Sequence, residues 1–592
     1  MSDRNSRYCE CNHARAIQWR AKSSEKELIM KRTVLVCAAA LMLLPACSRQ
    51  KLDPALASYI DSLMNSLYKS DQPGAVILVA KDGEPVFRKA YGLANLELNV
   101  PNTPENVFAI ASMTKQFTAV CVLQLLQQEK LSLQDDIRKY LPGYNTHGRL
   151  ITVEHLLTHT NGIPNVTVHP DFYRKEILEP SREELLNCSA NDSLLFEPGT
   201  DWSYNDVGFI MAAFIVERAS GMPFHEYMRK NIFDPAGMKN TTFGTRERVI
   251  PRMVTGYTPG EGESYRPEEY YSWTWGLGMG EIVTTVDDML RWDEALYTEK
   301  LVKRDLLERA WTSYALPDGQ KANYGYGWWV SQPGGIQIIV HPGAIGGFRS
   351  FSFRIPSQHL FVVFLSNNAR VGYTGPLESL SSTLAGLTRD IPPGRAISAE
   401  KMKEYTGVYE MGFLRIVSAK DVTREELYRT ITAHDTFLIS QQAGGRKVHL
   451  RNIGEDSFVA DDLAVYFRFR RDAGGKIIAL ERHMEPISFG PVRTERKTDH
   501  PLPKERDPIT LDESALKTFA GKYNFGGDHS SRVHVEGGRI YMQGVGDLLP
   551  ESGTRFFVKD ADVEVEFLKN PEGVVIGLIL KQGWVEEARK VE

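Results

Sequence analysis

A serine and a lysine three positions apart, Ser112 and Lys115, form the first pattern in the chain that could do chemistry. The apolar residues 108–111 lead into the pair, and the largely apolar residues 117–126 predict a mostly buried helix that begins there. On the first helical turn, the serine would gain from the free N–H groups of the helix N-terminus, which favour developing negative charge. A lysine partly cut off from water loses part of its preference for the charged form, so it can act as a base.

The spacing alone does not establish a catalytic pair, because a serine at this place is also a common cap of a core helix. The same Ser-x-x-Lys spacing begins at Ser23, Ser48, Ser66, Ser398 and Ser514. Two later motifs, Tyr204-Asn205-Asp206 and His341-Pro342-Gly343, set Ser112 apart from these serines.

Taken in order, the three motifs resemble those of the serine β-lactamase and penicillin-binding protein superfamily. They are most similar to its class C β-lactamase-like branch, with its carboxypeptidases, esterases and D-aminopeptidases. Residues 151–162, 231–238 and 278–292 agree with that branch. The resemblance spans about residues 55–388. It implies hydrolysis of an amide or ester through an acyl-enzyme.

The resemblance assigns roles to matching residues. It implies that Ser112 is the acyl-forming nucleophile and that Lys115 and Tyr204 are a coupled general base and acid. It implies an oxyanion hole made by the backbone N–H groups of Ser112 and Ala344. No cofactor and no metal are implied. Tyrosine is a poor base at its ordinary pKa near 10, so we expect Lys115 to lower the pKa of Tyr204.

Asp206, His341 and Gly343 are expected to bind the substrate. Asp206 stands where the family often has asparagine, which places a carboxylate near Lys115. Pro342 stands where relatives that process β-lactams or D-Ala-D-Ala peptides carry a hydroxyl residue, and His341 should be charged only part of the time at neutral pH. These departures predict an esterase or D-amino-acid peptidase-like enzyme rather than an efficient β-lactamase, with Asp206 favouring substrates that bear a free amine.

Other interpretations compete with this one. His155 and His159 have the i, i+4 spacing of a zinc pair, but no third ligand has a suitable spacing, so no metal is expected. An aromatic cluster is interpreted either as loop packing or as an apolar wall of the site; its members are Tyr270, Tyr271, Trp273 and Trp275. The alternative function is a non-catalytic, penicillin-binding-like envelope protein that binds peptidoglycan-type ligands, although a pure binder would not need the intact catalytic set.

The elements that must position these residues follow from apolar periodicity and turn signals. Hairpins at both ends of this part of the chain, with helices between them, predict an α+β fold: an antiparallel sheet flanked by helices, as in the β-lactamase/transpeptidase fold. The expected strands are residues 75–80, 85–91, 348–355 and 360–366, and the expected outer helices are residues 54–69 and 377–387.

Short strands and turns follow a proline-rich linker at residues 391–394. Residues 405–409 (Tyr-Thr-Gly-Val-Tyr) match residues 519–523 (Phe-Ala-Gly-Lys-Tyr), so we expect two related small β-barrel modules with an insertion near residues 411–433 in the first. A support or docking role is expected for them. The predicted organisation is an upstream extension and signal peptide (1–46), a hydrolase domain (47–390), a first barrel-like module (398–497) and a second (511–592).

The N-terminus predicts export. Lys31 and Arg32 precede an apolar run, residues 33–44, which is typical of a secretory signal and too short to span a bilayer comfortably. The end of this run resembles a bacterial lipobox with Cys47 as the lipidated residue. We therefore expect a protein of the periplasm or the outer membrane, attached as a lipoprotein through Cys47. Pro45 is not the usual small residue at its position, so ordinary signal-peptide cleavage stays open as the alternative. Whether translation starts at Met1 or Met30 stays open.

The composition of the chain limits which classes of partner it can bind. The net charge is −5 with no long basic run, which argues against nucleic acid. Hydrophobic residues make up 42% and charged residues 24%, values of a folded chain that exclude a disordered or multi-pass membrane protein. The expected partner is a small peptide, D-amino-acid derivative or ester substrate. Cys121 and Cys188 leave one disulfide or two free thiols open.

Overall fold

The computed structural model describes residues 52–168, 172–260, 264–387, 392–410, 428–434, 437–442, 445–460, 465–484, 493–502, 506–526, 529–559, 561–582 and 585–591. The predicted signal segment, Cys47 and residues 411–427 of the expected insertion lie outside the described residues.

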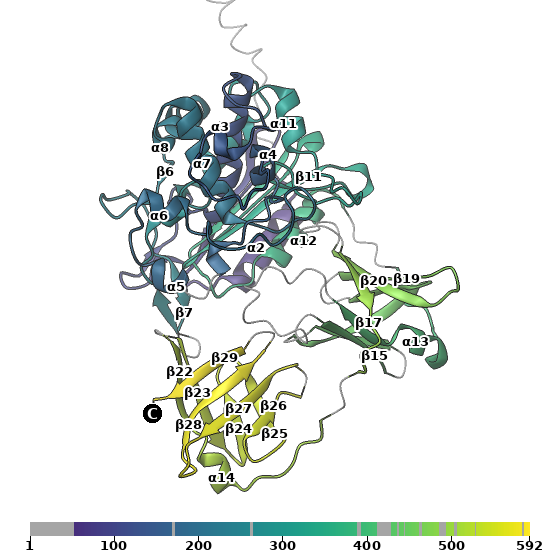
Figure 1. Ribbon diagram of the computed structural model, residues 1–592. Helices are drawn as coiled ribbons and strands as arrows, with labels where there is room; N and C mark the ends of the chain where they lie inside the picture. Colours follow the sequence, from purple (N-terminus) through teal and green to yellow (C-terminus); the bar gives the residue numbers. More distant parts are fainter. Residues whose placement is uncertain are drawn as a thin grey trace, which may run out of the picture. The chain divides into compact units, whose positions relative to one another are not determined.

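A six-stranded antiparallel sheet forms the centre of the N-terminal domain, in the order β10-β11-β12-β13-β1-β2 (Figure 1). Strands from the two ends of the domain meet in its middle, because β1 pairs with β13 from Ala75 opposite Ser366 to Lys81 opposite Leu360. Both expected hairpins are confirmed. The strands are β1 (Ala75–Lys81), β2 (Glu84–Tyr91), β10 (Trp329–Ser331), β11 (Ile338–Ile345), β12 (Phe348–Ile355) and β13 (Leu360–Ser366).

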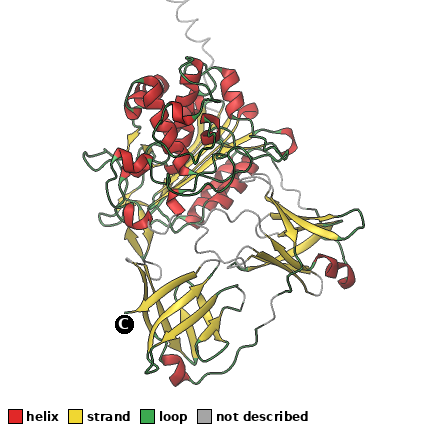
Figure 2. Cartoon of the chain, in the orientation of Figure 1, coloured by secondary structure: helices red, strands yellow, loops and turns green. Residues whose placement is uncertain are grey.

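Helices cover both faces of this sheet, which Figure 2 shows as yellow strands among red helices. The first six residues of β1 are buried in succession, because neither face of the strand meets water. Helix α10 packs on β1 and β13, whereas α2 and α12 pack on β2 and β12. The helices of the domain are α2 (Pro54–Leu67), α3 (Thr114–Gln127), α4 (Val153–Leu157), α5 (Phe172–Lys175), α6 (Arg182–Leu186), α7 (Asp206–Ser220), α8 (Phe224–Met228), α9 (Asp234–Ala236), α10 (Val286–Ala295), α11 (Arg304–Ala310) and α12 (Thr374–Leu384).

The two expected outer helices exist with shifted ends. Helix α2 stops at Leu67 because Tyr68 adopts an extended conformation, with φ −128° and ψ 104°. Helix α12 begins at Thr374 and stops at Leu384, shortly before Gly386, whose φ of +69° lies in the left-handed region that ends helices.

The core helix α3 lies against α7, and nearly every residue of α3 is buried. A helix that is buried all round needs partners on every side, so α3 is held firmly at the centre of the domain. Three short sheets complete the described part of the domain: β5 (Phe108–Ala109), β9 (Ile282–Thr284) and β6 (Thr242–Phe243); β3 (Leu93–Asn95) and β4 (Val100–Pro101); and β7 (Tyr257–Pro259) and β8 (Tyr265–Pro267).

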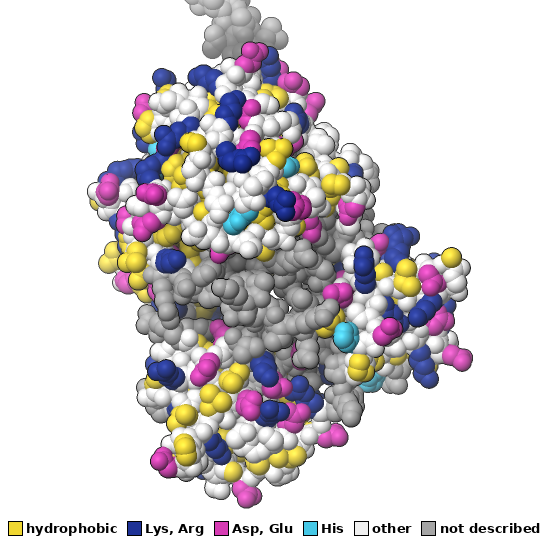
Figure 3. Space-filling view, viewed as in Figure 1, with side chains coloured by type: hydrophobic (Ala, Val, Ile, Leu, Met, Phe, Trp, Pro, Cys, Tyr) yellow, Lys and Arg dark blue, Asp and Glu magenta, His cyan; other side chains and the backbone are white. Residues whose placement is uncertain are grey.

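No single helix among the described residues is long and apolar enough to cross a membrane; one bent pair, 206–220 with 224–236, passes by length and composition alone. On the face drawn in Figure 3, basic and acidic side chains are interspersed. Cys121 and Cys188 are free thiols, which decides the alternative that the sequence left open.

Two closed eight-stranded barrels follow and confirm the expected repeat. The first contains α13 (Ala399–Tyr405), β14 (Gly407–Glu410), β15 (Tyr428–His434), β16 (Phe437–Gln442), β17 (Lys447–Gly454), β18 (Ser457–Ala460), β19 (Val465–Arg471), β20 (Ile477–Met484) and β21 (Arg493–Lys497). The second contains α14 (Glu513–Lys517), β22 (Gly521–Gly526), β23 (His529–Glu536), β24 (Arg539–Met542), β25 (Gly546–Pro550), β26 (Arg555–Phe557), β27 (Glu564–Lys569), β28 (Val575–Lys581) and β29 (Val585–Lys590).

The repeated five-residue motif has the same physical role in each barrel. The Tyr409 hydroxyl donates to the carbonyl oxygen of Tyr405, and the Tyr523 hydroxyl donates to that of Phe519, both at 2.6 Å. The glycine between them, Gly407 or Gly521, has a φ of +149° or +148°, a conformation that side chains disfavour. The repeat therefore records a turn into the first strand, locked by a buried tyrosine.

Candidate active site

Ser112 lies in a short 3-10 turn, Ala111–Met113, that leads directly into α3. Its two neighbours in the turn are buried, whereas Ser112 itself is partly exposed. Ala111 has a φ of +47°, an uncommon conformation for a residue with a side chain, and such strain concentrates at functional sites. The structure thus presents the hydroxyl of Ser112 at the surface end of the most buried helix.

Lys115 is fully buried one turn further along, and its ammonium group contacts three oxygen atoms. Nζ donates to Ser112 Oγ at 3.1 Å, to Asp206 Oδ1 at 2.6 Å and to the carbonyl oxygen of Met279 at 3.2 Å. Three acceptors match the three hydrogens of a charged lysine. The side chain therefore connects the serine to a buried carboxylate.

Asp206 is the first residue of α7, and it is held on its other side as well. Oδ2 accepts hydrogen bonds from Asn165 Nδ2 at 3.1 Å and from Thr167 Oγ1 at 2.9 Å. Both carboxylate oxygens thus have internal partners, and the side chain is buried. The structure places Asp206 as a partner of Lys115, and the expected contact of Asp206 with a substrate amine stays a prediction.

The charge state of the pair corrects one expectation. Burial alone would lower the pKa of Lys115, but the charge of Asp206 outweighs burial and holds that pKa above its ordinary value. Burial likewise would raise the pKa of Asp206, and Lys115 holds it below its ordinary value. In the resting protein Lys115 is therefore a charged ammonium and not the partly neutral amine that its position in a core helix predicted.

Tyr204 lies beside this pair, with Lys115 Nζ 4.9 Å from the centre of its ring. Its neighbours fix it: the N–H of Ser203 donates to the carbonyl oxygen of His159, and the N–H of Asn205 donates to His159 Nδ1, both at 3.0 Å. Burial raises the pKa of Tyr204, although Lys115 works against the rise. The expectation of a lowered tyrosine pKa is wrong, because desolvation exceeds the effect of a lysine whose charge Asp206 already neutralises.

His341, on β11, is also neutral. Its Nδ1 lies 2.7 Å from the carbonyl oxygen of Pro342 and so carries the proton, which leaves Nε2 to accept from the Tyr324 hydroxyl at 3.1 Å. Burial, with a smaller effect of Lys115, lowers the pKa of His341 to about 3. The expected partial charge at neutral pH is therefore wrong, and His341 offers no cation to a substrate.

The outer edge of β11 is open beside Ser112. Strand β10 pairs with residues 338–340 of β11, and no described strand pairs with the outer edge of residues 341–345. A two-residue turn joins β11 to β12, so Ile345 and Phe348 form a hydrogen-bonded pair. From that pair backwards along β11, the backbone N–H groups point alternately to β12 and to the opposite edge. The N–H of Ala344 consequently points to the open edge, where an oxyanion hole requires a donor.

Gly343 allows β11 to approach the serine turn. A Cβ atom at this position would lie 2.3 Å from the carbonyl oxygen of Ile110 and 3.2 Å from Cβ of Ala111. Only glycine permits this approach, so the structure brings Gly343 and Ala344 to the residue next to Ser112. By the same alternation, Pro342 faces the open edge without an N–H.

Aromatic rings surround Tyr204, and the sequence analysis missed two of them. Tyr324 and Trp329 contact each other at 5.0 Å between ring centres, and Trp329 stacks on Tyr204 at 6.0 Å. His159 packs on Tyr204 at 4.4 Å and on Tyr324 at 4.5 Å. No motif marks Tyr324 or Trp329, although the dense aromatic run at residues 324–329 was a signal that could have found them.

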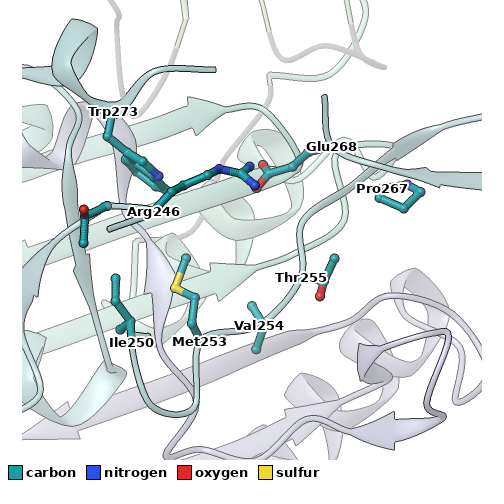
Figure 4. A pocket seen from close by; sticks show the side chains of 9 residues that line it. Arg246, Ile250, Met253, Val254, Thr255, Pro267, Glu268 and Trp273 are labelled. Carbon is teal, nitrogen blue, oxygen red and sulfur yellow. The ribbon is translucent and has the colours of Figure 1, made fainter. Parts of the chain in front are cut away.

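The structure separates the members of the two alternative clusters, and one of them, His159, packs on Tyr204 in the site itself. His155 lies in α4 and accepts the N–H of Thr152 at Nδ1, and the described residues contain no group of three or more side chains that could hold a metal. The aromatic cluster, interpreted as loop packing or as an apolar wall, is divided: Tyr270 is exposed, Trp275 is buried, and Trp273 lines a separate cavity (Figure 4).

An antiparallel sheet between helices, with a serine, lysine and tyrosine at one end of a free strand edge, defines the β-lactamase-fold serine hydrolases as a class. The chain belongs to the beta-lactamase family, whose model matches residues 56–374, more than half of the sequence. Residues 505–591 match a second model, a domain of unknown function (DUF3471).

Individual relatives agree with this assignment. Penicillin-binding protein 4* of Bacillus subtilis (strain 168) is 26% identical over 446 residues, 72% of this chain and 96% of that protein. A D-aminopeptidase of Gluconobacter oxydans (strain 621H) is 28% identical over 323 residues, 53% of this chain and 59% of that protein. The octameric penicillin-binding protein homologue from Pyrococcus abyssi shares the fold, with a TM-score of 0.51 at 22% identity over 74% of this chain and 99% of that chain.

Proposed function

We propose that the protein hydrolyses an amide or ester through an acyl-enzyme on Ser112, as a member of the class C β-lactamase-like branch. The observation that carries the proposal is the contact of Lys115 Nζ with Ser112 Oγ at 3.1 Å, beside Tyr204 and the free edge of β11. A serine that only capped a helix would need neither the buried ammonium nor the open strand.

The resting charge state shapes the first step. Lys115 is an ammonium, so it cannot take the serine proton until it has given one away. Substrate that closes the site removes water, which favours a proton shift across the 2.6 Å contact from Lys115 to Asp206. The amine of Lys115 then accepts the proton of Ser112 as Oγ bonds to the substrate carbonyl carbon.

The remaining proton transfers pass through the hydroxyl group of Tyr204. The N–H groups of Ser112 and Ala344 stabilise the oxyanion of the tetrahedral intermediate. When the bond to the leaving group breaks, the Tyr204 hydroxyl donates its proton to that group, and Lys115 returns a proton to Tyr204. Asp206 then returns its proton to Lys115. Water enters, and the same groups act in reverse to release the acid.

Esters and D-amino-acid amides are the proposed substrates, and β-lactams are poor ones. Neutral His341 and the missing N–H of Pro342 remove two contacts that a substrate carboxylate would use. The name of one relative, a D-aminopeptidase, supports the D-amino-acid amides in this range.

Purified protein should be assayed against p-nitrophenyl esters, D-amino-acid amides and the cephalosporin nitrocefin. We expect kcat/KM to be highest for an ester or a D-amino-acid amide. A higher kcat/KM for nitrocefin than for every ester and amide would reject this substrate range, and turnover that persists in Ser112→Ala would reject the acyl-enzyme.

We also propose that the protein is exported and attached to the membrane through a lipidated Cys47. The support is the basic pair Lys31-Arg32 followed by an apolar run that ends in Pro45-Ala46-Cys47. Mass spectrometry of the membrane fraction should find a diacylglyceryl group on Cys47 as the first residue. An unmodified residue, or cleavage at another position, would contradict the proposal.

A further inference from the structure

A cavity of about 330 Å³ lies at the turn that joins β11 to β12, apart from the catalytic groups. Two side chains of opposite charge, Arg246 and Glu268, line it and point toward one another in Figure 4. The remainder of the lining is mostly apolar and includes Ile250, Met253, Val254 and Trp273. A pocket with an apolar body and a few convergent polar groups is the usual form of a small-molecule site.

Glu268 is tied to the strand that carries the proposed oxyanion hole. Its Oε2 accepts the N–H of Gly347 at 3.0 Å, and a Cβ atom on Gly346 would lie 2.5 Å from the same oxygen. The carboxylate forms no ion pair with any residue that the structure describes. Its burial raises its pKa to about 7, against smaller effects of Gly347 and Arg246 that lower it.

Arg246 likewise forms no ion pair within 4.0 Å in the described part of the chain, although its charge lowers the pKa of Glu268. Its guanidinium lies over the ring of Tyr270, 4.8 Å from the ring centre, which orients the group without neutralising it. A half-buried carboxylate and an arginine that share a cavity without forming an ion pair are both available to a ligand. The two charges select a ligand that carries an ammonium and a carboxylate together.

The position along β11 shows which half of a substrate can reach the cavity. Tyr204, which is to protonate the leaving group, lies near His341 at the start of the open edge, with ring centres 6.4 Å apart. Glu268 lies at the opposite end of the open edge, because it accepts the N–H of Gly347. Gly347 is three residues beyond Ala344, so the two residues are at most about 10 Å apart. A substrate whose carbonyl oxygen meets Ala344 therefore directs its acyl half toward Glu268.

We propose that this cavity, the Arg246–Glu268 pocket, binds an acyl group that ends in an α-amino-acid headgroup, with the ammonium on Glu268 and the carboxylate on Arg246. The proposal rests on the hydrolase function proposed above and names the class of acyl group that the same site prefers. An acyl chain of about three carbon atoms between the reacting carbonyl and the α-carbon of the headgroup has a suitable length for this distance.

Four phenyl esters that differ only in the acyl group test the pocket. The α-aminoadipoyl ester, linked through its distal carboxyl, carries both charges; the adipoyl ester carries the carboxylate alone, the 5-aminopentanoyl ester the amine alone, and the pentanoyl ester neither. We expect kcat/KM, above the spontaneous rate, to be at least about tenfold higher for the α-aminoadipoyl ester than for the pentanoyl ester, the scale of one charged hydrogen bond.

Two variants separate the charges. Glu268→Gln should remove the advantage that the amine gives, and Arg246→Gln should remove the advantage of the carboxylate. Both variants should leave kcat/KM for the pentanoyl ester within about twofold of the wild type, because neither residue touches the reacting atoms.

The outcomes distinguish this proposal from the one on which it rests. Equal rates for all four esters, with hydrolysis that Ser112→Ala abolishes, would overturn the pocket and leave the hydrolase function intact. An equal loss on all four esters in Glu268→Gln would show that the carboxylate only supports the turn, and would also overturn the pocket. Hydrolysis of none of the esters, or hydrolysis that persists in Ser112→Ala, would overturn both proposals.

Discussion

Two buried ion pairs, one in the hydrolase domain and one in the first barrel, are alike in geometry. Lys115 and Asp206 lie 2.6 Å apart with side chains 0% and 10% exposed, and Arg429 and Glu495 lie 2.8 Å apart with side chains 5% and 2% exposed. Burying such charges costs free energy that their attraction only partly returns. Both pairs therefore raise the same question of what they are for.

Their surroundings answer it differently. Arg429 also donates to Ser440 Oγ at 3.1 Å and to Gln442 Oε1 at 3.3 Å, and Arg482 Nε lies 3.8 Å from Glu495, so the contacts described for the barrel pair are with other strands of the same barrel. Lys115 donates instead to Ser112 Oγ, which is partly exposed next to a free strand edge. A buried charge thus indicates chemistry where it touches an accessible nucleophile, and indicates a structural role where every contact is internal.

The largest effect should come from Ser112, the accessible nucleophile that the Lys115–Asp206 pair contacts. Ser112→Ala removes the nucleophile, so hydrolysis should fall by about 10³-fold or more, and labelling by a serine-directed phosphonate should stop. The matched control is Ser514→Ala, because Ser514 and Lys517 repeat the spacing on α14, where both side chains are exposed and Lys517 pairs with Glu513. Intact mass spectrometry that still finds the label on Ser112→Ala would end the assignment.

Replacing the cation of each ion pair should distinguish a catalytic role from a structural one. Lys115→Met should lower the acylation rate by at least about 10²-fold, the scale of lost general-base help. Arg429→Met should leave kcat/KM within about twofold and instead lower the free energy of unfolding by about 2 kcal/mol, because the buried Glu495 loses its nearer cation and keeps Arg482, whose Nε lies 3.8 Å away. Steady-state kinetics and denaturant titration of both variants measure this. A loss of activity in Arg429→Met at unchanged stability would reverse the assignment of the two pairs.

Asp206→Asn should shift a pH profile. Asp206 holds the pKa of Lys115 up against burial, which would lower it. The variant lacks the carboxylate that takes the Lys115 proton in the proposed first step, so the amine must form by loss of that proton to solvent. Burial, now opposed by Tyr204 but not by Asp206, lowers the pKa of Lys115, so the neutral amine forms at lower pH. The rise of the acylation rate with pH should therefore begin at a lower pH than in the wild type. Single-turnover acylation measured across pH shows the shift; an unmoved profile would mean that Lys115 is not the base.

The sequence predicted the strands that position the site better than the charges within it. Both hairpins follow from short apolar runs bounded by turn residues, and the structure has them within two residues of the expected ends. The grouping of Ser112, Lys115 and Tyr204 followed from the resemblance, and the structure brings them together.

The protonation states could not be predicted, because they depend on a balance between burial and neighbours that the order of residues does not contain. Asp206 next to Tyr204 was visible in the sequence, but not that both of its oxygens would be taken by Lys115, Asn165 and Thr167. Glu268 had no motif at all; only the fold places it against the turn after β11.

The smallest effect should come from removing the barrels altogether. Every hydrogen bond described for Ser112, Lys115 and Asp206 is made within residues 112–279, and the open edge that completes the site ends at Ile345. Each barrel closes its own strand ladder around its own apolar core, so neither requires the hydrolase domain to bury its interior.

A fragment of residues 47–390 should therefore be soluble and should hydrolyse small esters with a kcat/KM within about twofold of the full chain. Size-exclusion chromatography and the ester assay test this together. A fragment that is soluble only when residues 391–592 are added back would show that the barrels complete the hydrolase core, and a soluble but inactive fragment would show that they shape its site.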